Sequence, residues 1–188
     1  LLGWRYSVML GAQQSLWGTR LRPTTQDLDD LLLYCALGII LGGRLGYVLF
    51  YNPLFFIENP SEIPAVWRGG MSFHGGLVGA ALAMILQARA RKLPLLLLTD
   101  IAATVAPIGI FFGRLANFIN SELWGRITDV SWGVVFPNGG PDPRHPSQLY
   151  EAALEGIALF LILTIAAKTG GLRKPGLLTG VFGLFYGV

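Results

Sequence analysis

The chain has 188 residues, of which 53% are hydrophobic and only 13% are charged. An average soluble domain carries roughly 25% charged residues, so this composition indicates a protein whose solvent is lipid. A single cysteine excludes an intrachain disulfide. The formal net charge is +3, but the basic residues lie in separate short loops rather than in one stripe, which argues against nucleic-acid binding.

Five apolar runs follow one another along the chain and approach or exceed the roughly 18 to 20 residues that cross a bilayer core of about 30 Å. They lie near residues 1–17, 31–51, 71–88, 94–118 and 149–167. A sixth run begins at Gly176 and ends at Val188, too short to span at 1.5 Å per residue. We predict an all-α polytopic transmembrane helix bundle in one domain, residues 1–188, with about six helices here, and we expect the natural protein to continue beyond this C-terminus.

Basic residues favour alternate loops, and this bias predicts how the chain is oriented. Eight of the 14 lysines and arginines follow the first, third and fifth runs: Arg20, Arg22, Arg89, Arg91, Lys92, Lys168, Arg173 and Lys174. The loops 52–70 and 119–148 hold only Arg68, Arg126 and Arg144. Because positive loops stay in the cytoplasm, we predict an extracytoplasmic N-terminus and extracytoplasmic loops at 52–70 and 121–148.

Glycines recur four residues apart within several runs, a spacing that lets helix backbones approach closely in lipid. The pattern covers Gly38, Gly42 and Gly46, then Gly75 and Gly79, then Gly109 and Gly113. We interpret most of them as helix-packing positions. Asp100, which lies early in the fourth run, we interpret as a structural cap at a helix N-terminus.

Arg44 and Arg114 fall inside apolar runs, where a charged side chain costs at least ~2.5 to 3.5 kcal/mol unless it faces a partner or a wet cavity. Both lie late in runs that travel outward, and His74 begins a run on the same side. Helical spacing puts Asn117 one turn from Arg114. We therefore predict a polar cavity in the extracytoplasmic half, the alternatives being snorkelling or ion-paired arginines and a histidine that only bonds a helix end.

The chemistry of these groups suits transfer of a group from an anionic lipid. Arginine presents a rigid fork of donors that matches phosphate, and a neutral histidine can accept a proton from a thiol or hydroxyl. Two histidines and one cysteine make no usual zinc set, and HExxH and GxSxG are absent, so we expect neither metal nor cofactor. The alternative is a transporter of an anionic solute or lipid whose fourth helix breaks near Pro107 and Gly109.

Four segments carry a resemblance to a known family: GGRLGYVLFYNP from Gly42, GGMSFHGGL from Gly69, GRLANFINSELWGR from Gly113 and RHPSQLYEAALEG from Arg144. In this order they resemble prolipoprotein diacylglyceryl transferase. The resemblance implies a seven-helix enzyme of the bacterial inner membrane. Such an enzyme moves diacylglycerol from phosphatidylglycerol to the lipobox cysteine of a prelipoprotein signal peptide and releases glycerol phosphate.

The resemblance also implies site residues. Arg114 and Asn117 match the headgroup-binding signature, His74 matches the histidine of HGGL, and the remaining matches are Glu122, Gly125 and Tyr6. We expect Arg114 and His74 to be catalytic, and Arg44 to serve either packing or the headgroup. Ala116 and Ser121 depart from the family, since glycine is usual at both positions. The family's second functional arginine and a glutamate would follow the end of this chain.

Overall fold

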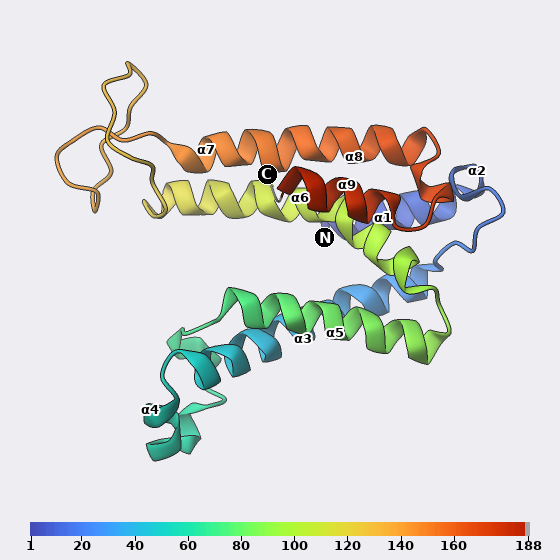
Figure 1. Ribbon diagram of the computed structural model, residues 1–188, viewed down its shortest axis with the longest axis horizontal. Helices are drawn as coiled ribbons and strands as arrows, with labels where there is room; N and C mark the ends of the chain where they lie inside the picture. The colour runs from blue at the N-terminus through green and yellow to red at the C-terminus, as the bar shows by residue number, and fades with distance from the viewer. Residues whose placement is uncertain (187–188) are drawn as a thin grey trace. The chain divides into compact units, whose positions relative to one another are not determined.

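The computed structural model describes residues 1–186, which are mostly helical and contain no β-strand, as predicted (Figure 1). The chain divides into two compact units, one made of Leu1–Arg22 and Thr99–Val188 and the other of Pro23–Leu98. The organisation of the chain as one domain stays a prediction.

Within residues 1–186, three helical segments are long and apolar enough to cross a membrane. They are α3 (Thr25–Phe50), α6 (Leu95–Ile119) and the segment Ser147–Lys168, which consists of α7 (Ser147–Glu151), the π-helix η3 (Ala152–Ala158) and α8 (Leu159–Lys168). Helix α5 (Phe73–Arg91) has 19 residues but carries His74 near its start and Arg89 and Arg91 at its end. These helices make the chain a multi-pass membrane protein.

The first apolar run differs from the single helix predicted over residues 1–17. It forms α1 (Leu2–Ala12) and α2 (Gln14–Trp17), separated at Gln13 by an extended backbone with φ −90° and ψ 90°. The indole nitrogen of Trp17 donates to the Leu10 carbonyl at 2.9 Å, and Arg22 Nη1 donates to the Ala12 carbonyl at 3.0 Å. These side chains satisfy the last carbonyls of α1, so the helix ends early without leaving them unpaired.

Helix α3 starts earlier than its apolar run because polar residues form a capping box at its N-terminus. Thr24 Oγ1 accepts from the Asp27 amide at 3.2 Å, and the Asp27 carboxylate accepts from the Thr24 amide at 2.9 Å. Two donors that a helix would leave unpaired are thereby satisfied.

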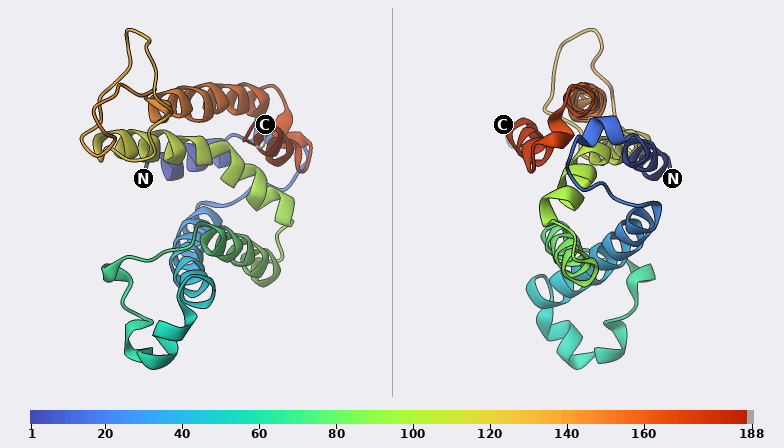
Figure 2. Two further views of the ribbon diagram at one scale, coloured as in Figure 1. Left: turned by 60° about the vertical axis from the view of Figure 1, so that its left-hand side comes forward. Right: turned by 90° about the vertical axis from the view of Figure 1, so that its right-hand side faces the viewer.

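Helices α3 and α5 lie side by side in the unit Pro23–Leu98, and glycines form their contact (Figure 2). A methyl group added at Gly79 would meet the backbone of Gly38, and one added at Gly75 would meet the backbone of Gly42. The predicted glycine packing is confirmed for this pair of helices. At Gly109 and Gly113 an added methyl would meet no atom within 4 Å in the described part of the chain, so these two glycines show no such contact.

The loop 52–70 contains short helices that the turn-rich sequence did not indicate. Asn52 precedes α4 (Pro53–Glu58), whose first residue is a proline, and η1 (Pro60–Glu62) and η2 (Val66–Arg68) follow. Proline suits the first position of a helix because the missing amide proton would have no partner there. The loop after α6 is mainly irregular and holds isolated bridges of Arg144 with Ile127 and Val134.

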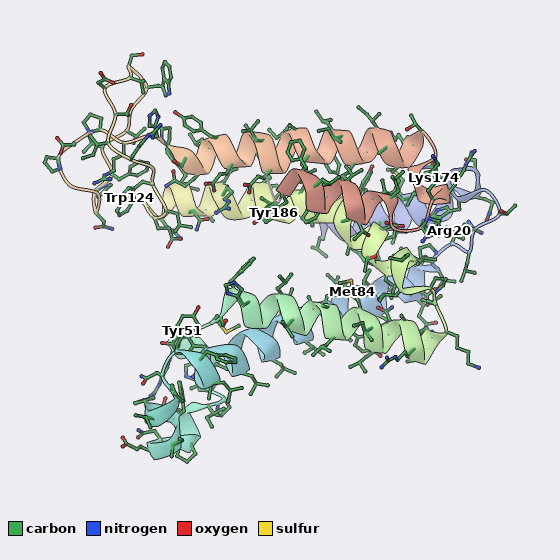
Figure 3. The ribbon with its side chains drawn as sticks, viewed as in Figure 1. Arg20, Tyr51, Met84, Trp124, Lys174 and Tyr186 are labelled. Carbon is green, nitrogen blue, oxygen red and sulfur yellow. The ribbon has the colours of Figure 1, made fainter. Side chains whose placement is uncertain are left out.

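In the other unit, α6 runs alongside α7, η3 and α8, as all views agree (Figures 1 and 2). The turn η4 (Gly171–Arg173) leads from α8 into α9 (Leu177–Tyr186). Arg20 and Lys174 lie at one end of this unit and Trp124 at the other (Figure 3). The predicted cytoplasmic and extracytoplasmic loops of this unit therefore lie at opposite ends of its helices.

Asp100 is fully buried in α6, and its carboxylate serves a different helix from the one predicted. It accepts from the amides of Gly176 at 2.9 Å and Thr179 at 3.1 Å, at the N-terminus of α9, and it pairs with Arg20 at 3.0 Å. Asp100 is thus a cap, as interpreted, but it caps α9 rather than α6.

Candidate active site

Arg114 lies in the last two turns of α6 and faces two carboxylates from the neighbouring helical segment. Its Nε is 2.8 Å from Glu151 Oε2, and its Nη2 donates to Glu155 Oε2 at 3.4 Å. The Arg114 side chain keeps 24% of its surface exposed. These ion pairs correspond to the alternative of an ion-paired arginine, since an intramembrane charge needs a partner, and the polar cavity stays a prediction.

A close approach of helices brings the carboxylates to Arg114. Gly156 lies against Phe111, one turn before Arg114, and a methyl group at Gly156 would come within 2.8 Å of Phe111 Cβ. The approach occurs within the π-helix Ala152–Ala158, a type of element often found at functional sites. An apolar pocket of about 150 Å³ also lies here, lined by Pro107, Phe111, Gly156 and Phe160 among others. The ion-paired Arg114 and a residue that lines an apolar pocket, Phe111, are therefore one turn apart.

Asn117 lies one turn beyond Arg114, and its amide donates to Glu122 Oε1 at 3.0 Å. Asn120 donates to the same oxygen at 3.2 Å. Gln148, fully buried at the start of α7, donates to the Glu122 backbone carbonyl at 2.5 Å. Two predicted residues, Asn117 and Glu122, therefore contact each other directly, and Gln148 ties their turn to α7.

Gly125 lies where the loop after α6 passes the start of α7. Its amide donates to the His145 carbonyl at 2.9 Å, and a Cβ atom at this position would collide with Ser147 Oγ. Arg144 holds the same loop, since its Nε donates to the Gly139 carbonyl at 2.8 Å and its guanidinium lies over the Trp124 ring (Figure 3 labels Trp124). Gly125 thus has a packing reason to be glycine.

His74 belongs to the unit Pro23–Leu98, at the second position of α5. Ser72 caps this helix by accepting from the Gly75 amide at 3.2 Å, and the exposed His74 ring lies edge-on to Phe73. The following glycine, Gly75, forms the contact with α3 described above. His74 and Arg114 belong to different units. That they line one cavity stays a prediction.

Arg44 is 6% exposed, and backbone carbonyls of the loop 52–70 occupy its donors. Nε donates to Ile63 at 2.8 Å, Nη2 to Glu62 at 2.7 Å, and Nη1 to Gly69 at 2.6 Å and Gly70 at 3.1 Å. The guanidinium also lies over the Phe56 ring. Of the two roles expected for Arg44, these contacts favour packing over headgroup binding.

Tyr6 in α1 is likewise engaged within its own unit. Its hydroxyl donates to Thr164 Oγ1 of α8 at 2.9 Å, and its ring packs edge-on against Phe160. Tyr6 thus links α1 to α8, and Phe160 also lines the apolar pocket near Arg114.

No group of three or more potential metal-ligating side chains occurs within residues 1–186.

Comparison with known proteins supplies the deciding observation. The family model for prolipoprotein diacylglyceryl transferase matches residues 1–188. A protein of Methylocella silvestris is 58% identical over 187 residues, which cover 100% of this chain and 69% of the relative. A protein of Beijerinckia indica is 57% identical over 191 residues, covering 100% of this chain and 70% of the relative. Both are named phosphatidylglycerol–prolipoprotein diacylglyceryl transferase. This chain belongs to the prolipoprotein diacylglyceryl transferase family.

Membership of the prolipoprotein diacylglyceryl transferase family bears on the transporter alternative. That alternative expected a fourth helix broken near Pro107 and Gly109, but α6 continues through both residues from Leu95 to Ile119. The relatives are named as transferases. The transporter interpretation is therefore not supported.

The structure also explains one departure from the prolipoprotein diacylglyceryl transferase pattern. Ser121, at a position where glycine is usual, has a φ of 55°. This left-handed conformation costs a residue with a Cβ roughly 1 to 2 kcal/mol, which accounts for the preference for glycine.

Sequence reasoning missed Glu151 and Glu155 as site residues, although both belong to the segment RHPSQLYEAALEG. Acidic residues at the start of an apolar run, four positions apart, were an available signal. An intramembrane arginine needs counter-charges, and these two lie on one face of a helix.

Proposed function

We propose that this chain transfers the diacylglyceryl group of phosphatidylglycerol to a cysteine thiol of a prolipoprotein, forming a thioether and releasing glycerol phosphate. The match to transferases of this name across residues 1–188 carries the proposal. The site adds a chemical reason, because Arg114 combines phosphate-type donors with an apolar pocket one turn away.

In the proposed reaction the cysteine loses its proton and its sulfur attacks the carbon of the diacylglyceryl group that is bonded to the phosphate oxygen. The carbon–sulfur bond forms as the carbon–oxygen bond breaks, and the bonding electron pair stays on the phosphate oxygen. Arg114 binds the phosphate and stabilises the negative charge that develops there. His74 accepts the thiol proton, since a histidine is suited to this transfer near neutral pH.

The other predicted residues support this site in the proposal. Asn117 and Glu122 offer polar groups to the glycerol hydroxyls of the headgroup, and Gly125 keeps the loop close to α7. The resemblance placed Tyr6 among the site residues, and Arg44 was expected to serve either packing or the headgroup. Their engaged donors support a positioning role for both instead.

We further propose that the protein lies in the bacterial inner membrane with its N-terminus outside and takes the lipobox cysteine of prelipoprotein signal peptides. Eight of 14 basic residues in the predicted cytoplasmic loops support this orientation. The separation of Arg20 and Lys174 from Trp124 along the unit that contains them is consistent with it (Figure 3).

The test is an assay of the full-length protein with labelled phosphatidylglycerol and a lipobox peptide. Arg114→Ala should lower transfer by about 100-fold or more, the effect of removing a donor to a developing oxyanion, and His74→Gln should lower it as well. Asp30→Asn, which removes an exposed ion pair with Arg91, serves as the control and should leave transfer unchanged.

A peptide with serine in place of the cysteine should release no glycerol phosphate. Full activity of Arg114→Ala would contradict the role of the arginine. Release of glycerol phosphate without a thiol, or solute flux in liposomes, would contradict the proposed transfer itself.

A further inference from the structure

The donors of Arg114 are divided unequally between its two carboxylate partners. Glu151 pairs with Nε at 2.8 Å, whereas Glu155 reaches Nη2 at the longer distance of 3.4 Å. Within residues 1–186, Nη1 has no hydrogen-bond partner. A phosphate can therefore accept two parallel hydrogen bonds from Nη1 and Nη2. Glu155 competes with the phosphate for Nη2.

The charges around Arg114 are unbalanced before any lipid binds. One guanidinium faces two carboxylates, so the cluster carries an excess negative charge, and a phosphodiester adds another. Both carboxylates are partly shielded from water, with Glu151 side chain 35% and Glu155 side chain 27% exposed. Repulsion between anions is stronger in such surroundings than in bulk water, so one carboxylate must move away for phosphate to bind well.

We propose that Glu155 is an internal anion that the lipid phosphate displaces from Arg114 and that returns as glycerol phosphate leaves, while Glu151 keeps the guanidinium in place. The inference rests on the proposed function. Glu155 is the exchangeable partner because its contact is longer and occupies the edge that phosphate needs, whereas Glu151 pairs at Nε, away from Nη1.

The proposal gives Glu155 a role in product release. Phosphatidylglycerol carries one negative charge at its phosphate, but the glycerol phosphate that leaves is a monoester and approaches two negative charges near pH 7. A product of higher charge binds arginine more strongly and would remain bound. Return of the Glu155 carboxylate to Nη2 replaces the product with a counter-charge that is already part of the chain.

The test measures inhibition of transfer by added glycerol phosphate in the full-length protein, together with KM and kcat for phosphatidylglycerol. In Glu155→Gln, which keeps the shape and removes the charge, the inhibition constant of glycerol phosphate should fall by about tenfold, the change expected for loss of one neighbouring charge. KM for the lipid should fall less, because the lipid carries less charge, and kcat should fall as product release slows.

Three further variants are measured in the same way. Glu155→Asp keeps the charge and should leave the inhibition constant within about twofold of the wild type, since only the reach changes. Asp30→Asn should leave it unchanged. If Glu155→Gln does not fold, as judged by thermal unfolding, Glu155→Met provides an uncharged side chain of similar size for the same measurement.

An unchanged or higher inhibition constant in the uncharged variants would overturn the inference, as would a larger decrease in Glu151→Gln than in Glu155→Gln. Either result with normal transfer by the wild type leaves the proposed function intact. Absence of transfer by the wild type would instead contradict the proposed function.

Discussion

Arg44 and Arg114 lie in apolar helices, yet their guanidinium groups are bound in different ways. Four backbone carbonyls of one loop receive the donors of Arg44, which is almost fully buried. Arg114 instead pairs through Nε and Nη2 with the side chains of Glu151 and Glu155. A backbone carbonyl cannot leave without unfolding its loop, whereas a side chain can rotate away. Of the two arginines, these contacts favour Arg114 as the one proposed to bind a ligand.

A second residue-scale feature is the left-handed backbone of Ser121, next to Glu122. We predict that Ser121→Gly raises the free energy of unfolding by about 0.5 kcal/mol, because relief of strain exceeds the entropy that glycine adds to the unfolded chain. Thermal unfolding in detergent measures the change. Ser131→Gly, in the same loop but without a positive φ, is the control and should be destabilising. Equal effects of the two substitutions would refute the strain argument.

At the scale of elements, α3 and α5 depend on backbone contact rather than on interlocking side chains. Gly38, Gly42, Gly75 and Gly79 remove the side chains that would hold the helices apart. The first glycine of the HGGL segment, Gly75, belongs to this contact, and it fixes the N-terminal turn of α5 where His74 lies. The packing of Gly75 against α3 thus positions His74, whatever chemical role the HGGL segment has.

We predict that Gly79→Ala destabilises the protein by about 1 to 3 kcal/mol, because the added methyl group would overlap the backbone of Gly38. Gly109→Ala, where an added methyl meets nothing within 4 Å in the described residues, should instead be neutral or stabilising by up to about 1 kcal/mol. The thermal unfolding temperatures of the two variants and the wild type in detergent measure these effects. A stabilising Gly79→Ala would show that the helices do not pack through these glycines in the membrane.

At the scale of the whole molecule, the proposed chemistry needs groups from both compact units. Arg114, Glu151 and Glu155 belong to one unit and His74 to the other. In the proposed reaction His74 takes the thiol proton and Arg114 binds the lipid phosphate, so the proposal requires both residues to act on the same pair of substrates.

We predict that cysteines at positions 74 and 114, in a Cys35→Ala background, are cross-linked by a short bismaleimide in membranes. A pair at 74 and 174 is the control and should not react, because Lys174 lies in a predicted cytoplasmic loop. Mass spectrometry of the digested protein identifies the cross-links. Absence of a cross-link between positions 74 and 114, or a cross-link in the control pair, would contradict the prediction that these two positions come together.

The sequence by itself determined the features that depend on local composition and on long motifs. Apolar runs identified the helices because lipid requires twenty or so apolar residues for each span, and four motifs identified the family. The glycine spacing predicted close helix packing, and the contact of α3 with α5 confirms it for these glycines. The break at Gln13 was not predicted, because it depends on Trp17 and Arg22 reaching back to carbonyls of α1.

Only the tertiary structure decided which charges meet. Asp100 caps α9, a helix some eighty positions away in the chain, and Arg114 pairs with Glu151 and Glu155 across a helix contact made possible by Gly156. A pairing between distant residues depends on how helices approach one another, and no local pattern encodes that distance. The sequence therefore predicted the arginine of the candidate site, whereas the tertiary structure identified Glu151 and Glu155 as its counter-charges.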